Sequence, residues 1–168
     1  MANIAIFGGT FNPFHIGHYQ MLSYLCSLDF VDKVLVMPDN IPPHKVCDYL
    51  ASDTDRINMC SLIIKDFEKA ELCLIEFERE GKSYSYDTIM ELKSRYPQKD
   101  FSFVCGGDMF VYFPKWYRYQ ELMRLLPFYV FGRTDTEVDE FDACFREFKE
   151  KGMQIIVNNT QIPDISST

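Results

Sequence analysis

The 168-residue chain lacks long hydrophobic runs, and no stretch approaches the roughly 18 consecutive apolar residues that a membrane-spanning helix needs. Its start also lacks a basic segment followed by an apolar one, the pattern of a signal peptide. Basic residues are outnumbered, with 17 Lys and Arg against 25 Asp and Glu. We therefore expect a cytoplasmic protein that binds neither membranes nor nucleic acid, although a small anionic ligand needs only a locally basic site.

Paired metal-ligand motifs are also missing. The sequence contains no Cys-x-x-Cys, and its three histidines have no carboxylate or thiolate partners at ligand spacing. No dedicated metal site is therefore predicted. The cysteines lie mostly in apolar runs, which is typical of reduced core residues in an intracellular protein. They are Cys26, Cys47, Cys60, Cys73, Cys105 and Cys144.

What the chain does contain is apolar and aromatic residues, at 47% and 15% of the sequence, enough for one domain with a full core. Predicted strands and helices alternate throughout, with no repeat and no long linker. This alternation indicates an α/β domain with a parallel sheet and right-handed crossovers. The expected strands cover residues 4–7, 33–38, 72–77, 100–105, 128–131 and 154–157, and the expected helices cover 16–28, 53–64, 89–96, 119–125 and 138–151.

One stretch near the start combines a strand, a glycine turn and a helix. The apolar run Ile4–Phe7 ends on Gly8 and Gly9, which allow the backbone to turn sharply and to approach a ligand closely. His15 and His18 follow where a helical pattern begins, and helix N-termini suit phosphate. The turn matches neither a P-loop nor a Gly-x-Gly-x-x-Gly fingerprint. Phosphate would therefore be held by backbone N–H groups and imidazoles.

The segment GGTFNPFHIGH at residues 8–18 resembles the signature of the nicotinate-nucleotide adenylyltransferases, a family within the nucleotidyltransferases that carry an (H/T)xGH motif. Three later segments carry the same resemblance, which covers nearly the whole chain. They are Pro-Pro-His-Lys at 42–45, Ser-Tyr-Ser-Tyr-Asp-Thr at 83–88, and Gly-Gly-Asp at 106–108 followed by Phe-Pro-Lys-Trp-Tyr at 113–117.

The resemblance implies a single Rossmann-like domain over residues 1–168, a doubly wound parallel sheet with strand order 3-2-1-4-5. The site would lie at the carboxyl ends of strands one and four. The implied reaction transfers the adenylyl group of ATP to nicotinate mononucleotide, giving deamido-NAD and pyrophosphate. Mg²⁺ would accompany ATP and be held largely by its phosphates.

The resemblance also implies roles for individual residues. His15, His18 and Lys45 would be catalytic, the histidines by donating hydrogen bonds to the triphosphate. The residues expected to bind ATP are Gly8, Gly9, Thr10, Phe11, His18, Gly106, Asp108, Ile165 and Ser166. Those expected to bind the mononucleotide are Asn40, His44, Lys45, Ser85, Trp116, Tyr117 and Arg133.

Several of these residues have simpler interpretations. His15 and His18 could merely satisfy backbone groups of a Gly-rich turn. Residues 39–45 fit a solvated loop, Ser85 has the chemistry of a helix cap, and Trp116 could be a core anchor. Two departures from the family pattern stand out. Arg133 is followed by Thr134 instead of Pro. The sequence stops at Thr168, before the family's C-terminal helix and its Arg, so either the sequence is truncated or the protein lacks this element.

Two alternative functions are open. The protein could transfer an adenylyl or cytidylyl group to another phosphate acceptor, such as phosphopantetheine. It could also bind nucleotides without transfer activity. The motifs around Ser85 and Trp116 argue against another acceptor, because such an enzyme needs no aromatic plate for a pyridine. The sequence leaves open the choice between nicotinate and nicotinamide and the formation of homo-oligomers.

Overall fold

The computed structural model describes residues 2–40, 50–81, 83–131 and 138–158, and of residues 108, 138–140 and 158 it describes the backbone alone. Five predicted site residues lie outside this range, and the side chain of Asp108 does too. The five are His44, Lys45, Arg133, Ile165 and Ser166.

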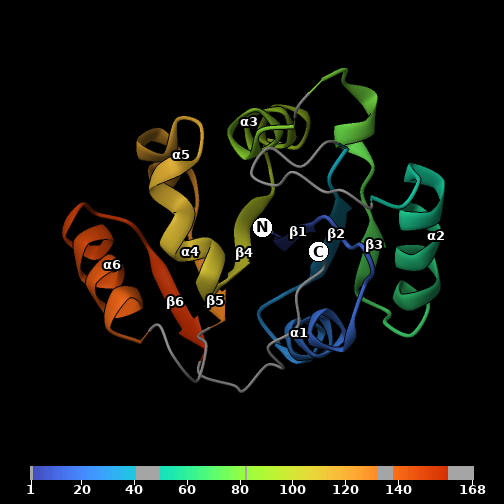
Figure 1. The fold of residues 1–168 in the computed structure, drawn as a ribbon, viewed down its shortest axis with the longest axis horizontal. Coiled ribbons are helices and arrows are strands. Elements are labelled where there is room, and N and C mark those ends of the chain that lie inside the picture. Colours follow the sequence, from blue (N-terminus) through green and yellow to red (C-terminus); the bar gives the residue numbers. More distant parts are fainter. Residues whose placement is uncertain (1, 41–49, 82, 132–137, 159–168) are drawn as a thin grey trace.

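A six-stranded parallel sheet forms the centre of the molecule, in the order β3-β2-β1-β4-β5-β6 (Figure 1). The predicted order is confirmed, and β6 extends it at one edge. The connections reverse direction between β1 and β4, the switch point at which open α/β sheets bind ligands. The strands are β1 (Asn3–Gly9), β2 (Lys33–Pro38), β3 (Ala70–Leu72), β4 (Asp100–Gly106), β5 (Phe128–Phe131) and β6 (Ile155–Asn158).

Six helices and two short 3-10 turns connect these strands within the described ranges. The predicted helices are all present, and Ser52 caps α2 by accepting a hydrogen bond from the Asp55 N–H at 3.1 Å. The elements are α1 (Ile16–Ser27), α2 (Asp53–Ile64), η1 (Ile75–Glu78), α3 (Ser85–Arg95), α4 (Gly107–Tyr112), η2 (Phe113–Lys115), α5 (Tyr119–Leu125) and α6 (Val138–Glu150).

The prediction of a strand over residues 72–77 is wrong beyond Leu72. β3 ends there, and the chain turns into η1, where Ile75 and Glu76 are buried. A short apolar run does not distinguish a strand from a buried turn. The sequence analysis also missed α4 and η2, which are too short to show a helical period.

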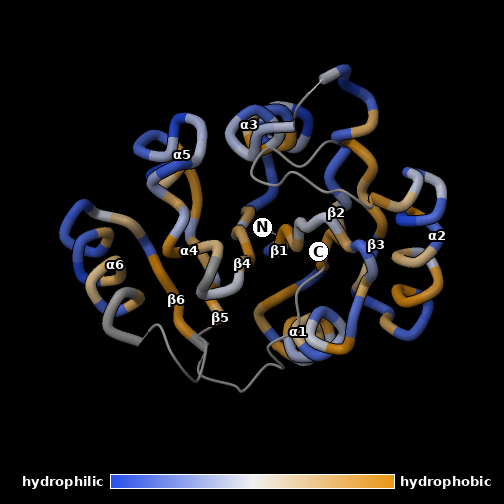
Figure 2. Tube along the Cα trace, viewed as in Figure 1, coloured by the Kyte–Doolittle hydropathy of each residue, from blue (hydrophilic) through white to orange (hydrophobic). Residues whose placement is uncertain are grey.

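Alternate side chains of each central strand enter two separate cores. On β1, Ile4 and Ile6 point into one core and Ala5 and Phe7 into the other. α3, α4, α5 and α6 contribute to the first core, and α1 and α2 to the second. Figure 2 shows this layering, with hydrophobic colours along the strands and hydrophilic colours on the outer turns of α3 and α5. Both faces of the sheet are therefore covered, as a parallel sheet requires.

The cysteines of the described ranges include one that is fully buried. Cys60 is fully buried on α2, and burial raises the pKa of its thiol to about 12. Cys26, Cys60 and Cys73 are reduced thiols, as predicted. In the described ranges no helix is both long enough and apolar enough to span a membrane.

The register of the strands sets where the functional segments meet. Gly9 at the end of β1 is paired with Pro38 at the end of β2, and Phe7 is paired with Val104 two residues before the end of β4. Because all strands are parallel, the segments that follow β1, β2 and β4 all leave the sheet at the carboxyl ends of the strands.

Candidate functional site

His15 and His18 cap α1 reciprocally. Nδ1 of His15 accepts hydrogen bonds from the backbone N–H groups of Gly17 at 3.1 Å and of His18 at 3.3 Å. Nδ1 of His18 accepts from the backbone N–H of His15 at 3.2 Å. This is the arrangement of a capping box, with two imidazoles in place of the usual hydroxyl and carboxylate. The rings stack with centroids 3.6 Å apart.

The cap fixes which nitrogen of each ring carries the proton. A nitrogen that accepts from a backbone N–H cannot itself be protonated, so the neutral rings of His15 and His18 carry their protons on Nε2. In this tautomer the Nε2–H group of each ring is a hydrogen-bond donor, and both rings belong to the N-terminus of α1. Two donors beside a helix N-terminus are suited to bind an anion such as phosphate.

Phe11 shapes the turn between β1 and these histidines. Its backbone is left-handed, with φ 49°, which is unfavourable for a bulky residue, and its ring is fully buried. The ring lies edge-on to Phe7 and packs on Phe14 and His18 at centroid distances of 5.5, 4.9 and 4.9 Å. Because the whole residue is enclosed, backbone included, the predicted contact of Phe11 with ATP stays a prediction.

Gly9 is required by the same turn. A Cβ at Gly9 would lie 3.1 Å from Cε1 of Phe11, closer than such contacts normally are, whereas a Cβ at Gly8 would make only ordinary contact with Met37. Packing against Phe11 is therefore one reason for glycine at position 9, and the predicted close approach of a ligand is another.

Arg56 of α2 joins the ends of β1 and β2, and the sequence analysis missed it. Its guanidinium donates to the carbonyls of Thr10 at 3.1 Å, Asp39 at 2.7 Å and Asn40 at 3.2 Å, and to the Asp53 carboxylate at 2.9 Å. The side chain is fully buried although it is charged. The available signal was an arginine on the apolar face of the predicted helix, three residues after an aspartate.

Two of the residues predicted to bind the mononucleotide, Ser85 and Tyr117, lie around the start of α3. Ser85 is the first residue of this helix and not its cap, so the capping interpretation is wrong. Tyr84 holds the cap position and makes no side-chain capping bond within the described part of the chain. Its ring centroid lies 4.8 Å from that of Tyr117, so this predicted substrate residue packs against the residue just before Ser85.

Trp116 lies in the core, close to this region. Its ring is 7% exposed and meets Phe103 and Phe113 edge-to-face at centroid distances of 5.6 and 5.3 Å. Stacking of Trp116 on a pyridine ring remains a prediction, and the described packing agrees with the core anchor that the sequence also allowed.

A buried polar cluster lies beneath the first turn of α3. The Thr88 hydroxyl donates to Oε1 of Glu76 at 2.9 Å and also contacts the Arg79 guanidinium. The amide of Asn40 donates to the Arg79 carbonyl at 3.0 Å. Glu76 is only 2% exposed, and this burial raises the pKa of its carboxyl against the opposing effects of Thr88 and Arg79. The cluster thus connects the end of β2 with α3.

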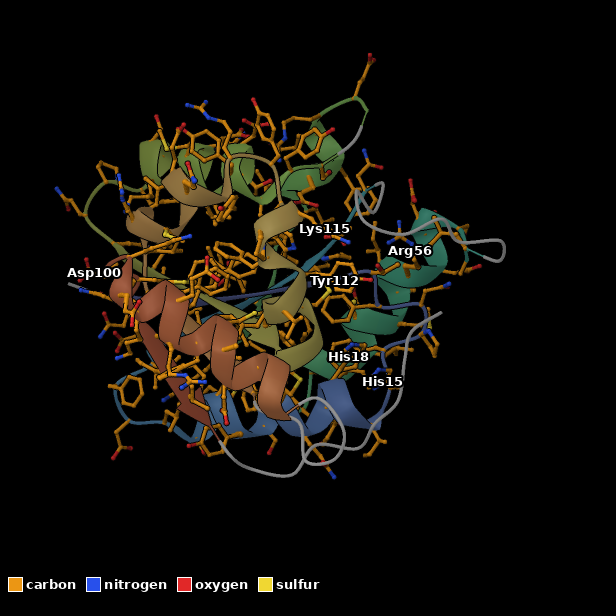
Figure 3. The ribbon with its side chains drawn as sticks, turned by 60° about the vertical axis from the view of Figure 1, so that its left-hand side comes forward. His15, His18, Arg56, Asp100, Tyr112 and Lys115 are labelled. Carbon is orange, nitrogen blue, oxygen red and sulfur yellow. The ribbon has the colours of Figure 1, made fainter. Side chains whose placement is uncertain are left out.

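Figure 3 shows how the site is arranged around the end of the sheet. His15 and His18 lie side by side at the start of α1, with Arg56 and Tyr112 on the same side of the molecule. Asp100, at the opposite end of β4, lies far from them. Gly106 ends β4 and holds the cap position of α4, and the backbone of Asp108 lies in the first turn of that helix.

No group of three or more His, Cys, Asp or Glu side chains that could hold a metal ion occurs in the part of the chain that the structure describes. A cation carried by a bound triphosphate needs few protein ligands, so the donors present are compatible with one.

Comparison with known proteins identifies the family. The cytidylyltransferase-like family matches residues 6–168. The probable nicotinate-nucleotide adenylyltransferase of Lactococcus lactis is 44% identical over 133 residues, which is 79% of this chain and 68% of that protein. The nicotinate-nucleotide adenylyltransferase of Bacillus subtilis is 42% identical over 128 residues, 76% of this chain and 68% of the relative. The chain belongs to the nicotinate-nucleotide adenylyltransferase family.

Solved structures support the same fold. The nicotinic acid mononucleotide adenylyltransferase of Plasmodium falciparum, complexed with APC, superposes with a TM-score of 0.78 at 23% identity, covering 99% of this chain and 77% of the other. A structure described as a putative nicotinate-nucleotide adenylyltransferase from Vibrio parahaemolyticus superposes with a TM-score of 0.67 at 24% identity. The superposition covers 92% of this chain and 84% of the other. The Rossmann-like nucleotidyltransferase fold expected from the resemblance is thus confirmed.

The buried carboxyl of Glu76 predicts a pH-dependent stability. A raised pKa means that the folded state holds its proton more tightly than the unfolded state, so stability is lost as pH rises above the usual value of 4.5. In Glu76→Gln this loss is absent. We expect the unfolding free energy of the wild type, relative to Glu76→Gln, to fall as pH rises from 4.5, measured by urea unfolding.

Glu150→Gln, a change at an exposed position on α6, is the matched control and should leave the pH profile of the wild type unaltered. A difference between wild type and Glu76→Gln that does not vary with pH would contradict the assignment.

Proposed function

We propose that this protein transfers the adenylyl group of ATP to nicotinate mononucleotide, giving deamido-NAD and pyrophosphate, a step in NAD biosynthesis. The names of its relatives support this assignment. The observation that carries it in the structure is the reciprocal cap of His15 and His18, which presents two Nε2–H donors at the turn after β1.

In the proposed reaction, an oxygen of the mononucleotide phosphate attacks the α-phosphorus of ATP in line. The bond from the α-phosphorus to its bridging oxygen breaks, and pyrophosphate leaves with the electron pair. The described residues offer no protein nucleophile in this role, and none is needed, because positioning and charge stabilisation account for such transfers.

The histidines would act on the leaving group. Their Nε2–H groups donate to the triphosphate oxygens, which gain negative charge as the bond breaks. Donors held by backbone hydrogen bonds need no reorientation at that moment. Mg²⁺ bound to ATP would supply further positive charge, and His44 and Lys45 remain predicted contributors to phosphate binding.

The mononucleotide is proposed to lie between the end of β2 and the start of α3, near Asn40, Ser85 and Tyr117. The first turn of α3 has backbone N–H groups free of a side-chain cap, and a pyridine carboxylate suits such a helix start. A cytoplasmic location is proposed with this function and fits the buried, reduced thiols.

The direct test is pyrophosphate release from ATP and Mg²⁺ with nicotinate or nicotinamide mononucleotide, on a chain extended through the C-terminal helix typical of the family. We expect release with the acid well above release with the amide. ATP binding without release in either case would favour a non-catalytic relative, and release only with another acceptor, such as phosphopantetheine, would favour that alternative.

His18 variants separate catalysis from helix capping. Glutamine at the third helical position can keep the cap by accepting from the His15 N–H, whereas alanine cannot. We expect His18→Ala to lower kcat by about 10²–10³-fold, because it removes one donor to the developing charge. His18→Gln should lower kcat less, because its amide keeps N–H donors. The KM for the mononucleotide should change little in either variant, as steady-state kinetics will show.

Unfolding curves provide the control for these variants. His18→Ala should lose about 1 kcal/mol of stability through the missing cap, and His18→Gln should lose less. Equal losses of turnover and of mononucleotide binding would argue against the assigned role of His18.

A further inference from the structure

Arg56 is a costly residue for its position. A cation without contact to water carries a desolvation penalty, which is why buried arginines need several partners. Among the described residues its carboxylate partner is Asp53, whose side chain is 54% exposed. The other acceptors are three neutral backbone carbonyls, of Thr10, Asp39 and Asn40.

All three carbonyls belong to segments that leave the sheet at the site. Thr10 directly follows β1, and Asp39 and Asn40 directly follow β2. The backbone N–H of Asp39 also donates to the Gly9 carbonyl at 2.9 Å, so the two segments are joined directly as well. A planar guanidinium can hold several acceptors in one fixed arrangement, which a single ammonium cannot do.

These contacts extend to the other side of the site. The carbonyl of Asn40 accepts from Arg56, and its side-chain amide donates to the Arg79 carbonyl. The Arg79 guanidinium in turn contacts Thr88 of α3. One continuous set of hydrogen bonds therefore runs from the turn after β1, through the end of β2, to the helix at which the mononucleotide is proposed to bind.

We propose that Arg56 is a positioning residue for adenylyl transfer. By fixing Thr10 relative to Asn40, it sets the geometry between the ATP side and the mononucleotide side without touching either substrate. The inference rests on the proposed function. In-line transfer requires the reacting atoms to be closely aligned, and a misplacement of about 1 Å can cost 10²-fold in rate. Arg56 should therefore affect kcat more than either KM.

The sharpest test uses a matched pair of substitutions in the first turn of α2. Asp53 and Asp55 are both exposed and both acidic, but only Asp53 contacts Arg56. Asp53→Ala removes the carboxylate that holds the guanidinium, and Asp55→Ala removes the same charge without that contact. We expect Asp53→Ala to lower kcat by about 5-fold or more with both KM values nearly unchanged, and Asp55→Ala to behave as wild type.

Arg56→Lys extends the series by keeping the charge and losing the planar fork. We expect kcat to fall by about 10²-fold in this variant, again with small changes in KM. If it fails to fold, the two aspartate variants decide alone, because both positions are solvent-exposed.

Amide hydrogen exchange supplies a readout that does not require activity. The N–H of Asp39 should exchange faster in Asp53→Ala than in Asp55→Ala or wild type, since Arg56 no longer holds that segment firmly. Equal exchange and equal kcat in the two aspartate variants would overturn the inference. An inactive wild type would instead refute the proposed function, and the exchange data would still decide the role of Arg56.

Discussion

The first turn of α1 has backbone N–H groups that need acceptors, and in this protein two histidines supply them. Because His15 and His18 accept through Nδ1, their protons are held at Nε2, at the edge where β1 ends. One set of hydrogen bonds thus begins the helix, stacks the two rings and sets the chemical character of the site. The left-handed backbone of Phe11 and the glycine at position 9 bring the chain from β1 into this arrangement.

Buried polar groups extend the same design to the rest of the site. Arg56 binds the carbonyls after β1 and β2, and the cluster of Glu76, Arg79 and Thr88 connects the end of β2 to α3. Arg56, Glu76 and Thr88 are buried, and each makes hydrogen bonds to backbone or neighbouring side chains that offset part of the cost of burial. The sheet supplies the position of the site, and these groups supply its internal geometry.

The sequence predicted the features that depend on local pattern. Apolar runs located the strands, and the motif at residues 8–18 placed His15 and His18 at the start of a helix. It failed where tertiary packing decides. Residues 75–78 alternate apolar and acidic residues as a strand can but form η1, and Arg56 is charged but buried. The reciprocal cap is local, but histidine is not among the usual capping residues, so the spacing did not predict it. The enclosed position of Trp116 depends on contacts between side chains in three dimensions.

The tautomers of His15 and His18 are the most direct test of this account. Nitrogen-15 NMR of the imidazole side chains, at a pH where the rings are neutral, distinguishes a protonated Nε2 from a protonated Nδ1. His44, the third histidine of the chain, can be replaced to assign the signals. The account predicts that both rings carry the proton on Nε2. A proton on Nδ1 of either ring would exclude the cap and, with it, the proposed orientation of the donors toward phosphate.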